Sequence, residues 1–247
     1  IRLLVDTTEE TSSEAIPYYF ARNPTPDYNI ALDGSYPVVI AEKGYGSVQA
    51  SFPVRAASGE GAEVISLTGG LAGNQIPSAA TAGLLTANPA ALIDQLNAAG
   101  NNYVAEHGAN FQIYATTVDT SSINSAQATR TTQADVVLTV QGVSAHSSEP
   151  HSGINPVSRL LDFLHTLDEQ GLLQRNHITD AARYASQNWG LDYLGNQLDI
   201  AYSDGFMGPL TGSLTYIGLD DQILVVTLNL RLPIGRSPDS TPSQRSS

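Results

Sequence analysis

The sequence predicts an α+β fold made of two similar sandwich units, each combining strands with helices. Two predicted helices open on an asparagine followed by a proline, at Asn88-Pro89 and at Asn155-Pro156, and each is set among strands. Asparagine is a good helix cap, and proline is favoured in the first turn. Because this plan occurs twice, we expect two related halves, at about residues 36–130 and 131–234.

Residues 1–35 precede these halves. Residues 1–5 are typical of a buried strand, residues 12–21 of a short helix capped by a serine, and residues 29–32 of a short extended segment. The turn dipeptide Asp33-Gly34 ends this region.

Periodicity predicts the elements of each half, because apolar residues recur on one face of a helix and alternate along a strand. In the first half, the strands cover residues 37–41, 47–55, 62–67 and 111–117, Gly44 marks a turn, and the helix face holds Leu92, Leu96, Ala99 and Tyr103. In the second half, a strand at 135–140 precedes a helix face of Val157, Leu160, Leu161, Leu164 and Leu167, followed by a helix at 179–188 and a hairpin of residues 210–217 and 222–230.

Composition excludes several classes of function. The net charge is −13 with a single lysine, Lys43, which argues against nucleic-acid binding because phosphate contacts rely on clustered basic residues. The chain has no cysteine, so disulfides, thiolate metal sites and cysteine nucleophiles are excluded, while cytoplasm and periplasm both stay open. No apolar run reaches the roughly 18 residues of a membrane span.

Both ends of the chain predict a piece of a longer protein. Residues 1–5 begin as a strand, without an initiator methionine or a signal peptide. Residues 235–247 are rich in serine and proline, so we expect a disordered tail or a cut linker.

The segment from Gly142 to Pro150 presents one histidine from a rigid frame. A predicted strand leads into a turn of small residues around His146, and the helix capped by Asn155 follows. Such an imidazole can act on a group outside its own domain, although a lone loop histidine is more often a surface residue. The remaining histidines are interpreted as surface or packed residues: His107, His151, His165 and His177.

Three carboxylates and one arginine are further candidates. Glu9 and Glu10 follow the first predicted strand, and Asp33 ends the next extended segment, so the three can converge on a cation. Alternatively, the glutamate pair stabilises the positive end of a helix dipole. Arg231 lies near a strand end, where it can bind a carboxylate through two hydrogen bonds. Alternatively, it is an edge residue of the sheet without a binding role.

Other common site motifs are missing from the sequence. There is no His-x-x-x-His pair, which argues against a zinc site built wholly within this chain. There is no Gly-x-Ser-x-Gly turn, and the glycine-rich segment 69–73 lacks the Gly-Lys-Ser/Thr ending of a phosphate loop.

Four segments carry a family resemblance, and their order and separations span nearly the whole ordered chain. They resemble the zinc-dependent dipeptidases of the aminoacylase/carnosinase metallopeptidase family, most closely the bacterial peptidase V type. The segments are residues 7–11, residues 32–34 followed by Tyr36-Pro37-Val38, residues 69–74 with Ile76-Pro77, and residues 142–156.

The resemblance implies a catalytic domain that binds two zinc ions and carries an inserted lid, or dimerisation, domain. Residues 1–35 are then a remnant of the α/β catalytic domain. Residues 36–234 form the lid, in which an antiparallel sheet carries helices on one face. A doubled lid favours a monomer, and otherwise we expect a homodimer.

The resemblance also implies roles for single residues. Glu9 is the general base that activates the metal-bound water, while Glu10 is a ligand of one zinc ion and Asp33 of the other. His146 stabilises the developing oxyanion. Asn74 contacts the substrate, and Arg231 binds its terminal carboxylate.

Two departures from the family pattern limit what this chain can do alone. Thr8 stands where family members often have aspartate, which leaves the roles of Glu9 and Glu10 intact. The family's remaining metal ligands, a histidine and a bridging aspartate upstream and a histidine downstream, lie beyond this sequence. We therefore expect the parent protein to hydrolyse dipeptides or short peptides, and this chain alone to be inactive.

Three alternatives stay open from the sequence. The first is a non-catalytic lid or dimerisation module, which gives Glu9, Glu10 and Asp33 no function. A deacetylase or desuccinylase of the same superfamily would keep the fold and change the substrate. An unrelated binding protein would require the four matches to be accidental.

Overall fold

The computed structural model describes residues 2–6, 14–30, 32, 39–70, 73–108, 110–118, 134–220 and 222–235 of the chain. The chain divides into two compact units, Ile1–Glu42 and Lys43–Ser247.

The first unit has one helix among its described residues, α1 (Ala15–Phe20), inside the range predicted for a helix. Its N-cap residue is Glu14 rather than the predicted serine. Residues 2–5 form no strand, contrary to the prediction, because no second strand pairs with them in the described part of this unit. A strand requires hydrogen bonds to a neighbour, so an apolar run alone is an insufficient signal.

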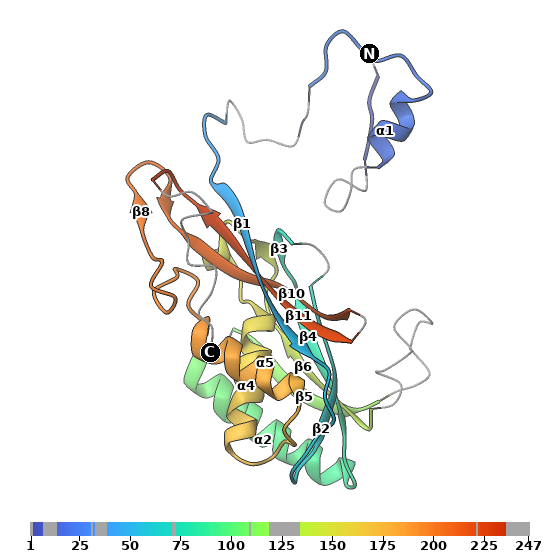
Figure 1. The fold of residues 1–247 in the computed structure, drawn as a ribbon, viewed down its shortest axis with the longest axis vertical. Helices are drawn as coiled ribbons and strands as arrows, with labels where there is room; N and C mark the ends of the chain where they lie inside the picture. The colour runs from blue at the N-terminus through green and yellow to red at the C-terminus, as the bar shows by residue number, and fades with distance from the viewer. Residues whose placement is uncertain are drawn as a thin grey trace. The chain divides into compact units, whose positions relative to one another are not determined.

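The second unit is built on one seven-stranded antiparallel sheet, with strand order β1-β11-β10-β2-β4-β6-β5 (Figure 1). Its outer strands are β1 and β5, and β10 and β11 form the predicted hairpin. The strands are β1 (Gly44–Pro53), β2 (Glu63–Gly69), β4 (Ala79–Leu85), β5 (Gln112–Thr117), β6 (Val136–Gln141), β10 (Thr211–Asp220) and β11 (Ile223–Leu232).

Three helices cover one face of this sheet and enclose an apolar core with it (Figure 1). α4 (Pro156–Glu169) packs against β4, β6 and β10. α5 (His177–Asn188) packs against β1, β2 and β11, and α2 (Pro89–His107) against β5 and β6. α4 lies at the centre of the core, since it supplies many of its largest fully buried side chains: Leu160, Leu161, Phe163, Leu164 and Leu167.

Asparagine caps fix where these helices begin. Asn88 and Asn155 each accept hydrogen bonds from amides of the first turn, which confirms the two predicted caps. Asn176 caps α5 through a capping box, so that helix begins at His177 rather than at residue 179. The Asn155 amide also donates to the carbonyl oxygen of Leu214 in β10 at 2.8 Å, which ties the start of α4 to the sheet.

The α+β class with an antiparallel sheet is confirmed, but the finer description as two sandwich units is not. Strands from before and after residue 130 join in one sheet, because β1 pairs with β11 and β4 with β6. The boundary between the predicted halves lies outside the described residues. Within the described part of the chain, no helix is both long and apolar enough to cross a membrane.

Several strand boundaries differ from the prediction. Residues 39–41 form no strand, and β1 instead begins at Gly44, which the sequence marked as a turn. The sequence pattern did not predict β4, because its sequence Ala-Ala-Thr-Ala-Gly-Leu-Leu is dominated by small residues of low strand propensity. Its strand character comes from pairing with β2 and β6 on both sides.

The sheet opens between β10 and β2, which pair at a single position, Ile217 with Gly69. Beyond that point lie two short paired strands, β3 (Gln75–Ile76) and β7 (Ala145–His146), and the 3-10 turn η2 (Pro150–Ser152). β3 and η2 both lie against β10. A separate two-stranded hairpin, β8 (Ser203–Asp204) with β9 (Gly208–Pro209), precedes β10.

Gly70 makes the exit from β2 possible. Its φ is +79°, and a Cβ atom there would lie 1.7 Å from the carbonyl oxygen of Thr215. Only glycine allows both this backbone conformation and this close approach.

We predict that Gly70→Ala destabilises the chain far more than Gly171→Ala. Gly171 has a similar φ of +71° but open space around the position of a Cβ. Gly171→Ala should therefore cost only the backbone strain of about 1 kcal/mol. Gly70→Ala should cost about 3 kcal/mol or more, since the sheet must also move. Urea unfolding of both variants measures this, and equal losses would contradict the steric argument.

Candidate functional site

The structure describes three of the six predicted site residues, Asn74, His146 and Arg231, all in the second unit. Glu9, Glu10 and Asp33 lie outside the described residues, so their roles stay predictions.

The short β3–β7 pair brings Asn74 and His146 together, although they are far apart in the sequence. His146 lies opposite Gln75 in the register of this pair. One residue further, the amide of Ser147 donates to the carbonyl oxygen of Asn74 at 2.8 Å. Asn74 and His146 are therefore held on neighbouring backbone segments by main-chain hydrogen bonds.

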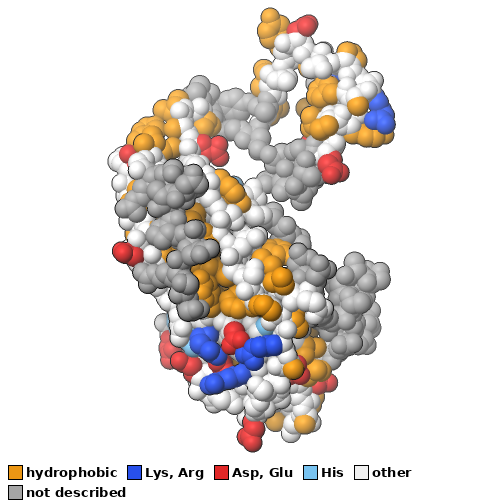
Figure 2. Space-filling model, viewed as in Figure 1, with side chains coloured by type: hydrophobic (Ala, Val, Ile, Leu, Met, Phe, Trp, Pro, Cys, Tyr) orange, Lys and Arg blue, Asp and Glu red, His pale blue; other side chains and the backbone are white. Residues whose placement is uncertain are grey.

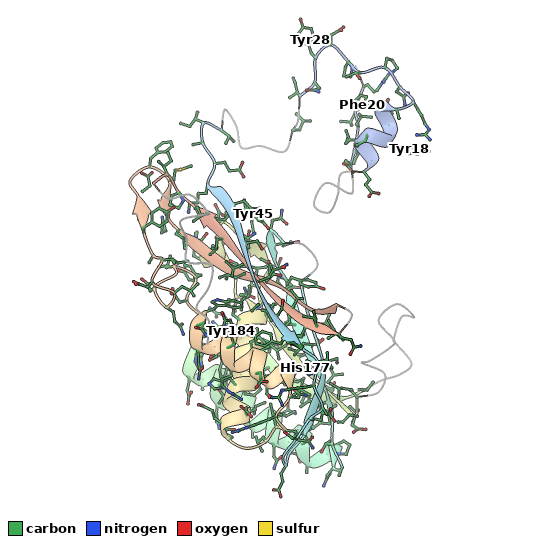
Figure 3. All side chains as sticks on the ribbon, viewed as in Figure 1. Tyr18, Phe20, Tyr28, Tyr45, His177 and Tyr184 are labelled. Carbon is green, nitrogen blue, oxygen red and sulfur yellow. The ribbon has the colours of Figure 1, made fainter. Side chains whose placement is uncertain are left out.

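Arg231, which lies in the sheet, contacts Ser147, the residue after His146. It lies in β11, opposite Tyr45 of β1 and Thr211 of β10. Its side chain is 8% exposed, and its Nε donates to Ser147 Oγ at 3.4 Å. The guanidinium also lies 5.5 Å from the ring centroid of Tyr45, a labelled residue in Figure 3.

Ser147 connects these parts. It is fully buried, its amide binds Asn74, and its hydroxyl contacts Arg231. Its carbonyl oxygen accepts a hydrogen bond from Ser213 Oγ of β10 at 3.5 Å. One small polar residue thus links the turn at Asn74, the arginine of β11 and the adjacent strand β10.

Asn229 provides a second link between sheet and loop. Its Nδ2 donates to the carbonyl oxygen of Gly73 at 2.8 Å, immediately before Asn74. Asn229 and Arg231 point to the same face of β11, opposite the core-facing leucines. The alternation of Thr227, Asn229 and Arg231 with apolar residues was a usable signal, but sequence reasoning singled out only Arg231.

His146 itself is exposed. Its Nδ1 lies 2.6 Å from Ser148 Oγ and 3.2 Å from the amide nitrogen of Ser148. These contacts orient the ring from within its own turn, so the opposite ring atom, Nε2, points away from its local partners.

The described residues do not make a metal site. No group of three or more His, Asp or Glu side chains is arranged to hold a metal ion in the described ranges. The Nδ1 atom of the exposed His146 contacts Ser148.

Comparison with known proteins shows two kinds of similarity. Residues 128–190 match the M20_dimer family model, described as a peptidase dimerisation domain. The chain is 27% identical over 241 residues to "Putative dipeptidase YtjP" of Bacillus subtilis, covering 95% of this chain and 46% of that protein. It is 25% identical over 245 residues to the Beta-Ala-Xaa dipeptidase of Lactobacillus delbrueckii subsp. lactis, covering 99% of this chain and 47% of that protein.

The chain is therefore similar to dipeptidases of this kind, and residues 128–190 are similar to the dimerisation domain of the M20 peptidases. The resemblance carried by the four sequence segments is thereby confirmed at the level of the family. The chain spans about half the length of the curated relatives it matches.

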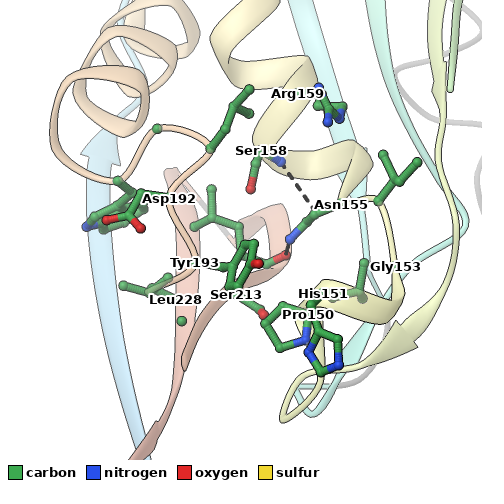
Figure 4. Close-up of a pocket in the computed structure, with 17 residues that line it drawn as sticks. Pro150, His151, Gly153, Asn155, Ser158, Arg159, Asp192, Tyr193, Ser213 and Leu228 are labelled. Carbon is green, nitrogen blue, oxygen red and sulfur yellow. Dashed lines mark hydrogen bonds between the residues drawn. The ribbon is translucent and has the colours of Figure 1, made fainter. Parts of the chain in front are cut away.

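A small cavity of about 180 Å³ lies between the start of α4 and β10 (Figure 4). Asn155, Ser158 and Asp192 contribute polar groups to its lining. Ligand pockets usually measure about 300–1,000 Å³. The cavity is therefore too small to replace the loop as the candidate site.

Basic side chains gather over the helices in Figure 2, where ion pairs hold several of them. Arg55 donates from Nε and Nη2 to one carboxylate oxygen of Asp180, at 2.9 and 2.5 Å. Arg183 lies 3.3 Å from Asp168. The first pair joins the segment after β1 to α5, and the second joins α5 to α4, so the cluster is interpreted as structural.

We predict that Asn229→Ala loosens the turn that carries Asn74. Loss of the hydrogen bond to Gly73 should lower the free energy of local opening of this turn by about 1 kcal/mol. Hydrogen exchange of the Ser147 amide should therefore accelerate about fivefold to tenfold. Native-state hydrogen exchange measures this. Gln49→Ala is the matched control, because Gln49 bonds Thr227 on the same face without touching the loop. Equal acceleration in both variants would contradict a direct link.

We also predict a pH-dependent contribution from Asp192, beside the cavity. Burial acts to raise its pKa, but hydrogen bonds from the amides of Gln197 and Leu194 and from Asn196 outweigh burial and lower the pKa. A lowered folded-state pKa gives stability above the unfolded value near pH 4, which is lost as the pH falls further. Urea unfolding at pH 6 and pH 3 should show Asp192→Asn less stable than wild type at pH 6, with a smaller difference at pH 3. A constant difference would contradict this.

Proposed function

We propose that this chain is the substrate-binding lid, with part of the catalytic domain, of an M20-family zinc metallopeptidase that hydrolyses dipeptides or short peptides. The observation that carries the proposal is the convergence of Asn74, His146 and Arg231 around the buried Ser147. The names of the two relatives support dipeptides as substrates.

Arg231 is proposed to bind the terminal carboxylate of the substrate. Arginine presents a planar fork of donors that matches a carboxylate, and such bonds strengthen where water is largely excluded. At 8% exposure, Arg231 is in a largely water-excluded position. Tyr45 and Ser147 hold the guanidinium from two sides, which reduces the entropy lost on binding.

His146 is proposed to donate a hydrogen bond to the oxygen that becomes negatively charged in the reaction. A donor fixed before the reaction stabilises such an oxyanion without further rearrangement. Asn74 precedes Gln75, the residue that pairs with His146 in the β3–β7 ladder. It is proposed to contact the substrate between its reacting carbonyl group and its terminal carboxylate.

The chemistry of bond cleavage is proposed to require groups beyond the described residues. Glu9 remains the predicted general base, and Glu10 and Asp33 the predicted ligands of two zinc ions. The described residues do not complete such a site. We therefore infer that the chain alone is inactive and that its parent enzyme supplies the missing ligands.

A second candidate function is a non-catalytic dimerisation module. The match of residues 128–190 to a peptidase dimerisation domain favours it. It predicts a homodimer in which Asn74, His146 and Arg231 have no substrate, whereas a doubled lid predicts a monomer. A deacetylase or desuccinylase activity has less support, since the two relatives are named as dipeptidases.

We predict that Arg231→Lys and His146→Ala in the parent enzyme produce different kinetic defects. Arg231→Lys should raise KM for a dipeptide about tenfold or more, but not for the corresponding dipeptide amide, which lacks the carboxylate. His146→Ala should lower kcat about 10²-fold to 10³-fold, with metal content unchanged.

Arg175→Ala serves as the control, because Arg175 is an exposed residue before α5. It should leave both parameters unchanged, and circular dichroism checks that each variant folds. Loss of metal in His146→Ala, or equal effects of Arg231→Lys on dipeptide and amide, would contradict the assigned roles.

A further inference from the structure

We propose that Ser148 holds the neutral imidazole of His146 in the tautomer that carries its proton on Nε2. The catalytic meaning of this inference rests on the proposed function, but its geometry does not. Ser148 is a positioning residue, since it acts only through His146.

The direction of the hydrogen bonds at Nδ1 decides the tautomer. The amide nitrogen of Ser148 lies 3.2 Å from Nδ1 of His146, and a backbone amide can only donate. Nδ1 must therefore offer its lone pair. Ser148 Oγ lies 2.6 Å from the same atom, and a hydroxyl beside an unprotonated nitrogen donates to it. Two donors at Nδ1 leave the ring proton on Nε2.

The surrounding turn keeps Ser148 in this position. The amide of Glu149 donates to the carbonyl oxygen of His146 at 3.0 Å, which closes the turn over Ser148. Ser147 is buried against the sheet, and Pro150 is buried after it. The burial of these two residues leaves Ser148 facing the ring of His146 instead of the core.

His107 provides an internal contrast. Its Nδ1 lies 2.9 Å from the carbonyl oxygen of Tyr103, which can only accept. His107 must therefore carry its proton on Nδ1 when neutral. The same chain thus holds two histidines that the structure assigns to opposite tautomers.

The tautomer of His146 matters because only one ring nitrogen faces away from the turn. With Nδ1 engaged by Ser148, Nε2 is the atom left for a ligand. A proton on Nε2 makes the neutral ring a donor, as stabilisation of an oxyanion requires. The opposite tautomer would present a lone pair, which repels a negative oxygen.

The test is a two-bond proton–nitrogen correlation spectrum of the ¹⁵N-labelled 247-residue chain, recorded at about pH 8 where free histidine is neutral. His146 should show a protonated Nε2 and an unprotonated Nδ1, and His107 the reverse. Ser148→Ala should raise the ratio of the Nδ1–H to the Nε2–H form of His146 about threefold to tenfold, as expected for loss of one hydrogen bond.

Two further variants make the result specific. Ser148→Thr keeps the hydroxyl and should restore the wild-type ratio. Ser144→Ala removes a hydrogen bond to Ile76 within the same loop without reaching the ring, so it should leave the ratio unchanged. A proton on Nδ1 of His146 in wild type, or a ratio unaffected by Ser148→Ala, would overturn the inference.

Kinetics of the parent enzyme separate this inference from the proposed function. If both hold, Ser148→Ala lowers kcat for a dipeptide with little change in KM, and Ser148→Thr restores it. If the spectra show the expected tautomer but Ser148→Ala and His146→Ala leave kcat unchanged, the inference stands and the proposed role of His146 fails.

Discussion

The candidate site depends on the docking of one polar loop against the β10–β11 hairpin, with Ser147 buried at the contact. A buried polar residue is costly unless its groups find partners. Ser147 satisfies this condition with three partners from three different elements. These bonds stabilise the loop in the position that places Asn74, His146 and Arg231 around Ser147.

The sheet makes this docking possible because it opens between β10 and β2. A fully paired ladder there would leave no room for β3, β7 and η2. The single pairing of Ile217 with Gly69, followed by the left-handed turn at Gly70, ends β2 early. The cap residue Asn155 then bonds β10, so the start of α4 closes the same region from the core side. The backbone conformation at Gly70 and the cap at Asn155 thus determine where the loop can pack.

The sequence predicted those features that depend on interactions between residues close together in the chain, such as the helix caps. The caps at Asn88 and Asn155 follow from side-chain bonds within one helical turn, so the sequence alone locates them. β4 depends on two neighbouring strands, which no local pattern displays. Prediction of the site has the same limit. The turn around His146 is a contiguous motif that the sequence displays. The roles of Ser147 and Asn229 depend on contacts between distant segments, which bring residues 73, 147 and 231 together.

Arg231 shows how such a site differs from a core designed for stability alone. Its neighbours in β11 are leucines, and at 8% exposure its charge has lost most of its water. Burying a charge costs stability, and replacing buried ionic groups by apolar ones is often stabilising. Ser147 and the Tyr45 ring are among the contacts that recover part of that cost. The proposed role of Arg231 would add one more contact, to the carboxylate of a peptide terminus, to a guanidinium that the fold already holds in place.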